Sequence, residues 1–452
     1  MSRSCLAAIM LSGFVASASF AQSPTEVSPL APDKTQSAAV PSPASTAPQL
    51  APADSVGGFD PVAATDAYLG TLPAAARAKS DSYFEGGYWI YVWDFLVTVA
   101  VMLLLLQTGI SRRIREAAER VTRSRWIHVF IYFALFTLLI TILTLPWTLY
   151  TDFFREHQYD LSNQTFGAWA GDQAKGLAVT LVLGGLAVAG LYAVVRRLPK
   201  TWPVWGSLVA MLFLVVGVLI GPIYIVPLFN KVTRIDDPEV SKPILSMARS
   251  NDISVSDVFV VDASRQSKRV SANVSGIFGT ERITLNDNLL NRTSLPEIKA
   301  VTGHEMGHYV LNHIYEFLAY TLIIVIAAFA FIQRGFEWAR QRWGAKWGIR
   351  DIADPAGLPL VSLLMTIFFF LLTPVTNSIT RTNEAEADMF GLNVAREPDG
   401  FARAALRLSE YRKMEPGPIE EMVFYDHPSG RTRIYKSMVW KAEQLRLDKA
   451  QQ

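Results

Sequence analysis

Three of the six histidines in the sequence fall close together, in the segment GHEMGHYVLNH at 303–313. Histidine is a common metal ligand, and it is costly to place beside lipid. His304 and His308 are four residues apart, so on a helix both imidazoles can reach one metal ion. Glu305 is placed to take a proton from a water molecule rather than to bind the metal. The pattern predicts a metal-dependent hydrolase; histidines that only make hydrogen bonds at a helix end are the alternative.

A catalytic zinc site needs a third protein ligand and one open position. A third histidine six residues after His308 is excluded, because position 314 is isoleucine. His313 lies off the ligand face and is expected to be an interfacial polar residue. The segment ITRTNEAEADMFG offers Glu384 as the third ligand, with Asp388 on the same helix face as a hydrogen-bond partner of a ligand imidazole. An acidic, solvated helix start is the alternative.

The residues around HExxH favour a helix. Ser294 and Glu297 have the spacing of a capping box. Apolar residues then recur at helical spacing, at Leu295, Ile298, Val301 and Val310. Both imidazoles are therefore expected on one face of this helix.

The composition indicates a membrane protein. Of the 452 residues, 50% are hydrophobic and only 18% are charged, below the roughly 25% usual in soluble domains. Six apolar stretches approach the ~20 residues that a spanning helix needs; they are 88–107, 126–149, 177–195, 204–229, 317–332 and 358–374. A very hydrophobic soluble core fits poorly with so many runs joined by charged connectors. The net charge of +2 gives no electrostatic footprint for a nucleic acid.

The N-terminus has the pattern of a secretory signal. Residues 1–21 combine Arg3, an apolar run and a small-x-small end, so they predict a signal peptide, with a retained anchor as the alternative. Residues 22–57 are rich in Pro, Ala and Ser and predict a disordered tether. The one cysteine, Cys5, excludes a disulfide within the chain.

The charges of the connectors predict the orientation. Three connectors are rich in arginine and lysine: 111–125, 196–201 and 334–350. The positive-inside rule places them in the cytoplasm. Alternation then places 230–316 and everything after Pro374 on the extracytoplasmic side. Both halves of the candidate site therefore share one side of the membrane, which we expect to be the bacterial inner membrane.

In order along the chain, the motifs resemble those of the integral-membrane zinc metalloendopeptidases of the CAAX prenyl protease type I group. The matching segments are REHQYDLSNQTFGAW (155–169), PLFNKVT (227–233), VVDASRQSKRVSANVSGIFGTERITLNDNLL (260–290), GHEMGHYVLNH (303–313), TRTNEAEAD (380–388) and DHPSGRTRI (426–434). The resemblance implies one Zn²⁺ per chain. It implies His304, His308 and Glu384 as the ligands, with Glu305 as the general base.

The resemblance also implies two kinds of contact with the substrate. His427 and Arg433 would stabilise or position the scissile carbonyl; on their own they indicate only a turn followed by a solvated helix face. An edge strand would pair with the substrate backbone, and its residues are Ser271, Ala272, Asn273, Val274 and Ser275. The family's Asn-Ala-Tyr-like residues are replaced here by Ser-Ala-Asn, and a structural hairpin is the alternative.

We therefore predict a polytopic α-helical membrane protein with about six transmembrane helices and an α+β zinc metallopeptidase domain with a small β-sheet. The expected divisions after the tether are a four-helix membrane domain (58–229), the HExxH segment (230–316), two further spans (317–374) and a C-terminal segment (375–452). The expected partners are a peptide or protein substrate and the lipid bilayer. A catalytically silent peptide-binding adaptor and a zinc hydrolase of lipid or cell-wall amides are the alternatives.

Overall fold

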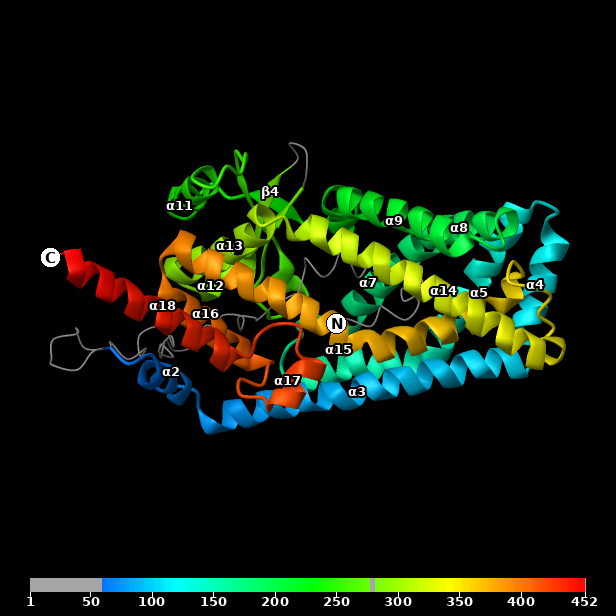
Figure 1. The fold of residues 1–452 in the computed structure, drawn as a ribbon, viewed down its shortest axis with the longest axis horizontal. Helices are drawn as coiled ribbons and strands as arrows, with labels where there is room; N and C mark the ends of the chain where they lie inside the picture. Colours follow the sequence, from blue (N-terminus) through cyan, green and yellow to red (C-terminus); the bar gives the residue numbers. More distant parts are fainter. Residues whose placement is uncertain (1–58, 277–280, 452) are drawn as a thin grey trace.

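The computed structural model describes residues 59–276 and 281–451, so the predicted signal peptide and tether lie outside the described residues. The molecule is elongated, with a bundle of long helices at one end and shorter helices around a small sheet at the other (Figure 1). Six helices are long and apolar enough to cross a membrane. The predicted fold class is confirmed.

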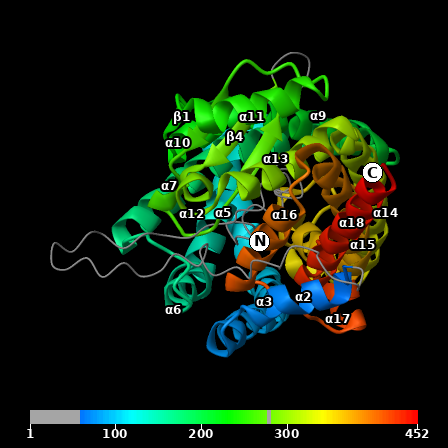
Figure 2. The same cartoon turned by 90° about the vertical axis from the view of Figure 1, so that its left-hand side faces the viewer.

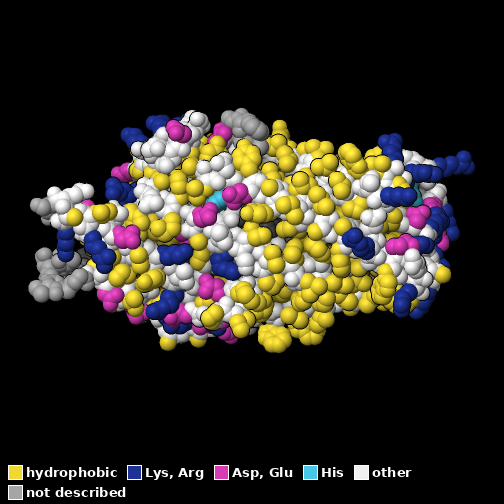
Figure 3. All heavy atoms as spheres, viewed as in Figure 1, with side chains coloured by type: hydrophobic (Ala, Val, Ile, Leu, Met, Phe, Trp, Pro, Cys, Tyr) yellow, Lys and Arg dark blue, Asp and Glu magenta, His cyan; other side chains and the backbone are white. Residues whose placement is uncertain are grey.

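Three of the six spans are nearly continuous helices: α3 (Ala74–Gln107), α14 (His313–Trp347) and α15 (Leu358–Ala395). The other three contain a π-helical turn. They are α5 (Arg125–Thr148) with α6 (Arg155–Gln158), α7 (Phe166–Val179) with α8 (Gly185–Arg197), and α9 (Trp202–Ile220) with α10 (Val226–Phe229). Apolar side chains cover the middle of the molecule, and charged side chains gather toward its two ends (Figure 3).

Helix α15 does not end at Pro374, where the apolar stretch in the sequence ends, but continues to Ala395. A proline inside a helix leaves the carbonyl four residues earlier without its N–H partner. Tyr91 of α3 supplies a replacement, because its hydroxyl donates to the Phe370 carbonyl at 3.3 Å. The helix therefore extends past the apolar stretch and carries Glu384 and Asp388 with it.

The small sheet has four strands in the order β1-β2-β4-β3. They are β1 (Val232–Arg234), β2 (Val258–Val261), β3 (Ala272–Ser275) and β4 (Arg282–Asn286). β2 and β4 run parallel, and the two outer strands pair antiparallel to them. Ile283 and Leu285 of β4 are fully buried in one core with Met306, a residue of the HExxH helix. The sheet thus fixes the position of that helix.

Of the further helices, some lie against the sheet or the HExxH helix and others lie farther from both (Figure 2). The helix with HExxH is α13 (Leu295–Val310), and Glu297 accepts from the Ser294 N–H at 2.9 Å, as the predicted capping box requires. The others are α2 (Pro61–Gly70), α11 (Pro238–Arg249), α12 (Asp287–Arg292), α16 (Pro398–Arg407), α17 (Pro418–Phe424) and α18 (Gly430–Gln451).

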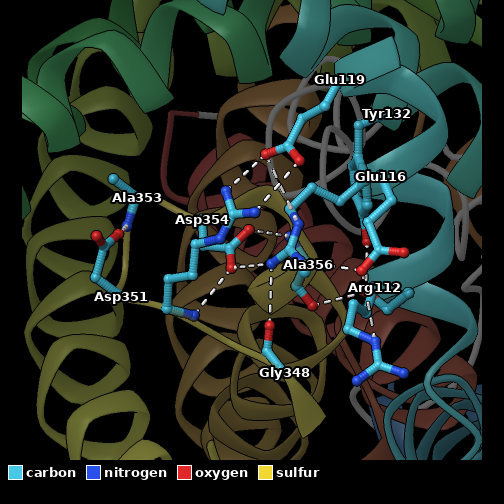
Figure 4. A network of polar contacts seen from close by, with 12 residues as sticks. Arg112, Glu116, Glu119, Tyr132, Gly348, Asp351, Ala353, Asp354 and Ala356 are labelled. Atoms are coloured by element: carbon cyan, nitrogen blue, oxygen red, sulfur yellow. Dashed lines mark hydrogen bonds and ion pairs between the residues drawn. The ribbon is translucent and has the colours of Figure 1, made fainter. Parts of the chain in front are cut away.

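The opposite end of the bundle carries a network of ion pairs between α4 (Ile110–Val121) and the loop before α15 (Figure 4). Arg115 and Asp354 form its buried centre, with an Nη1–Oδ2 distance of 2.6 Å and side-chain exposures of 5% and 2%. Arg115 also donates to the Gly348 carbonyl at 3.0 Å, and Gln333 donates to the Pro199 carbonyl at 3.2 Å. The three basic connectors therefore meet at one end of the molecule.

We predict that Arg115→Ala destabilises the protein by about 3–5 kcal/mol, because it leaves the buried Asp354 carboxylate without its cation. The matched control is Arg350→Ala. Arg350 pairs with Glu119 at 2.6 Å, but 59% of its side chain is exposed, so its loss should cost less than about 1 kcal/mol. Unfolding of the purified protein in detergent by SDS titration measures both. Equal losses for the two variants would contradict the prediction.

Candidate metal centre

The centre is built where α13 and α15 pack with almost no side chain between them. Gly303 and Gly307 of α13 face Ala387 and Gly391 of α15. A Cβ added at Gly391 would lie 2.7 Å from the backbone nitrogen of His304, and one at Gly307 would lie 3.0 Å from the Ala387 Cα. Small residues spaced by four allow helix backbones to approach closely. This contact brings the HExxH motif beside the carboxylates of α15.

The structure brings the three predicted ligand side chains together. His304 Nε2 lies 3.1 Å from Glu384 Oε2, and His308 Nε2 lies 3.5 Å from Glu384 Oε1. The two imidazole Nε2 atoms are 3.2 Å apart. One donor atom from each residue lies within 4.8 Å of the other two, so all three can bind one ion.

Asp388 contacts the His304 ring, and Arg433 in turn binds Asp388. Its Nδ1 lies 2.8 Å from Asp388 Oδ1, the contact that the spacing of Glu384 and Asp388 led us to expect. Arg433 of α18 binds both carboxylate oxygens of Asp388, with its Nε donating to Oδ2 at 2.9 Å. The resemblance implies that Arg433 stabilises or positions the scissile carbonyl. In the structure it binds Asp388, the partner of His304, and its role toward the carbonyl stays a prediction.

His427 reaches the centre from the segment between α17 and α18. Its Nε2 lies 3.1 Å from Glu384 Oε2, so the imidazole borders the ligand cluster. Its other nitrogen, Nδ1, contacts Asp426 Oδ1 at 2.8 Å. Asp426 is not among the residues predicted from the sequence, although its carboxylate directly before the HP pair is a signal that could have identified it.

The contact of His313 with His308 and Glu386 was also not predicted from the sequence. His313 is buried at the start of α14, and its Nδ1 lies 2.9 Å from Nδ1 of His308. Its Nε2 lies 3.3 Å from Glu386 Oε2. No pattern in the sequence predicts this arrangement, because on one continuous helix position 313 would not face His308. His313 was expected to be an interfacial polar residue, but in the structure it is buried.

The environment of the centre favours a cation among the carboxylates. Burial alone would lower the pKa of His304, but the carboxylates of Asp388 and Glu384 beside its ring outweigh burial and raise the pKa to about 10. Burial raises the pKa of Glu305, and the nearby His304 and His308 oppose that rise only in part. Burial also acts on Asp426, but His427 and Arg412 outweigh it and lower the pKa of that carboxyl.

These residues fit a metal ion. Glu384 Oε2 is buried and, within the described part of the chain, accepts no hydrogen bond of good geometry. Two imidazole nitrogens and one carboxylate oxygen are the donor set that catalytic metal sites of this kind use. The Nδ1 atom of each imidazole also has a partner, Asp388 for His304 and His313 for His308. Such a partner is usual for metal-binding histidines.

The candidate edge strand lies next to this centre in the fold. β3 begins at Ala272, one residue after the predicted Ser271, and ends at Ser275 as predicted. Val274 packs on the same core as Met306 of α13. Among the described residues, β3 pairs only with β4, so it is an edge of the sheet.

The fold and the site together define a membrane-embedded metallopeptidase. Residues 234–438 match the profile of peptidase family M48, and residues 66–231 match that of the CAAX prenyl protease N-terminal domain, described as five membrane helices. The chain belongs to peptidase family M48. The described residues contain four candidate spans between Ala74 and Phe229, one fewer than the profile describes.

Its relatives include bacterial and eukaryotic proteins. The uncharacterized metalloprotease YhfN of Bacillus subtilis is 28% identical over 353 residues, which cover 76% of this chain and 82% of that protein. A CAAX prenyl protease 1 homolog of Oryza sativa is 31% identical, over 64% of this chain and 68% of its own. The crystal structure of S. mikatae Ste24p is 22% identical with a TM-score of 0.70, over 81% of this chain and 89% of that one, and shows the same fold. The chain is thus a membrane metalloendopeptidase that requires a metal ion.

We predict that Gly391→Ala displaces α13 from α15 and disrupts the metal centre. The new methyl group meets the backbone of His304 rather than a side chain that can move. A displacement approaching 1 Å costs about 100-fold in turnover. Gly171→Ala is the matched control, because a Cβ at this helical glycine has nothing within 4 Å. Peptide cleavage and bound metal are measured for both; a variant at Gly391 with full activity would contradict the prediction.

Proposed function

We propose that this protein is a zinc endopeptidase that hydrolyses peptide bonds of extended or unfolded protein segments on the extracytoplasmic side of a bacterial inner membrane. The observation that carries the proposal is the cluster of His304, His308 and Glu384 with Glu305 beside it. The similarity to CAAX prenyl proteases makes prenylated C-terminal peptides a second substrate class.

Zinc is the proposed ion because of the donor set. Imidazole nitrogens suit zinc and several other transition metals, and a His₂Glu set with an open position is typical of zinc peptidases. When bound, the ion supplies a Lewis acid that activates water and polarises the substrate carbonyl. His304, His308 and Glu384 would hold it, while Asp388 and Arg433 keep the His304 ring in place.

Proton transfer is assigned to Glu305. Its carboxylate follows the first ligand histidine, and burial raises its pKa toward the range in which it can both accept and return a proton. It takes the proton of the attacking water and later delivers it to the leaving amine. A residue in this role contributes about 100- to 10,000-fold to the rate.

His427 is proposed to stabilise the negative charge that develops on the scissile carbonyl oxygen. Its Nε2 borders the ligand cluster, and Asp426 accepts from Nδ1–H and fixes the orientation of the ring. Nε2 is the donor when the ring is doubly protonated. A positioned donor of this kind is worth about 3–4 kcal/mol in the transition state. Arg433 binds Asp388, and this contact supports the positioning part of the role that the resemblance implies for it.

The peptide is proposed to bind along the outer edge of β3. Asn286 N–H donates to the Ser271 carbonyl at 2.9 Å. Bonded and non-bonded pairs alternate in an antiparallel ladder, so the N–H and C=O groups of Ala272 and Val274 point away from β4. Such an edge holds an extended backbone with little selection among side chains. This supports protein segments over lipid or cell-wall amides as substrates.

Length and charge support the proposed membrane side. The three basic connectors meet at one end of the molecule. Glu384 lies 26 residues after Leu358 on α15, which corresponds to about 39 Å along a helix. The hydrocarbon core is ~30 Å thick. The centre is therefore proposed to lie at the far boundary of the bilayer from the cytoplasmic connectors.

We predict that Glu305→Gln keeps the metal and loses cleavage. Metal analysis should find one zinc ion per chain in both proteins, while turnover of an unfolded, unprenylated polypeptide falls by about 100- to 10,000-fold. The same assay with a farnesylated CAAX peptide separates the two substrate classes. A wild-type protein without bound zinc, or a variant with undiminished turnover, would refute the proposal. Peptide binding without cleavage by the zinc-loaded wild type would favour the adaptor.

We predict that a cysteine at position 236 reacts with a membrane-impermeant maleimide in intact spheroplasts. Asp236 is exposed on the side of the metal centre, and Lys200 is exposed in a basic connector. In a Cys5→Ser background, Asp236→Cys should be labelled at once, and Lys200→Cys only after permeabilisation. The reverse pattern would place the active site in the cytoplasm and leave the chemistry unchanged.

A further inference from the structure

His313 occupies a position that neither the HExxH pattern nor the ExxAD pattern assigns. Its side chain is 6% exposed, and it lies between the candidate ligand His308 and the carboxylate of Glu386. The two nitrogens that meet, His308 Nδ1 and His313 Nδ1, are 2.9 Å apart. The ring centroids are 5.1 Å apart with the ring planes 67° from parallel, so the rings meet edge to face.

The break between α13 and α14 produces this contact. α13 ends at Val310, and Asn312 adopts a left-handed backbone conformation with a φ of 62°. A residue five positions after His308 on a continuous helix would be rotated well away from it. The left-handed turn restarts the helix at residue 313 and returns the His313 ring to His308.

The proton positions on His308 and His313 follow from taking His308 as a ligand of the metal ion. His308 Nε2 faces His304 Nε2 and Glu384, so it must keep its lone pair to bind an ion. A neutral imidazole then carries its proton on Nδ1. That N–H donates to His313 Nδ1, which must be an acceptor. His313 therefore carries its own proton on Nε2 and donates it to Glu386 Oε2 at 3.3 Å.

We propose that His313 is a positioning residue that holds His308 in the tautomer and ring orientation required for metal binding. The inference rests on the proposed function, because it takes His308 as a ligand. His313 is not itself a ligand, since it contacts the nitrogen of His308 that points away from Glu384. Groups that fix a ligand imidazole in this way are worth about 10- to 100-fold in metal affinity.

Two near-isosteric substitutions test the proposal. Asparagine places its Oδ1 where His313 Nδ1 stands, so His313→Asn keeps an acceptor for the His308 N–H. Glutamine places its polar atoms near the Nε2 position and leaves the His308 N–H without that acceptor. We expect zinc affinity close to wild type for His313→Asn and about 10- to 100-fold weaker affinity for His313→Gln. Competition with a chelator on the purified full-length protein measures both, independently of cleavage.

The thermal midpoint of each metal-free protein shows whether weaker zinc binding by a variant comes from unfolding. His308→Ala is the reference, because it removes the ligand itself and should abolish tight binding. If His308→Ala binds zinc like wild type, the proposed metal centre is wrong. If His308→Ala fails to bind but His313→Gln and His313→Asn both bind like wild type, the metal centre stands and the role of His313 is wrong. Equal weakening by both His313 variants would likewise contradict it.

Discussion

The contact between α13 and α15 is the constraint on which the centre depends. Gly303, Gly307, Ala387 and Gly391 leave so little space that a single added methyl group would meet backbone atoms. Helices at this separation cannot slide or rotate without a clash. The candidate ligands on the two helices are therefore held at fixed distances, even though Glu384 follows His308 by 76 positions in the sequence, with the long apolar helix α14 between them.

The polar groups around the centre form a second, concentric layer. Asp388 and His313 contact the outer nitrogens of His304 and His308, and Arg433 and Glu386 contact those partners in turn. A buried imidazole or carboxylate is costly unless its charge and hydrogen bonds are met. These partners supply the required charges and hydrogen bonds, and they keep the donor atoms of His304 and His308 directed toward Glu384.

The long helices connect the end of the molecule that carries the basic connectors with the end that carries the metal centre. At one end the buried Arg115–Asp354 pair ties α4 to the loop before α15, among basic connectors (Figure 4). At the other end the same α15 emerges to carry Glu384 and Asp388. The Tyr91 hydroxyl donates to the Phe370 carbonyl, which Pro374 leaves without its N–H partner. Membrane anchoring and ligand presentation are therefore properties of a single helix.

Local patterns in the amino-acid sequence were enough to predict the class of fold and the metal-binding motif. The spacing of His304, Glu305 and His308 and the capping box before them are local features of one helix, and apolar length alone reports membrane spans. Contacts between distant segments place the remaining groups around the centre. The place of Arg433 on Asp388, the extension of α15 beyond Pro374 and the return of His313 to His308 depend on contacts between distant segments and on one left-handed residue. Periodicity in the sequence carries no information about such contacts, because it describes each helix alone.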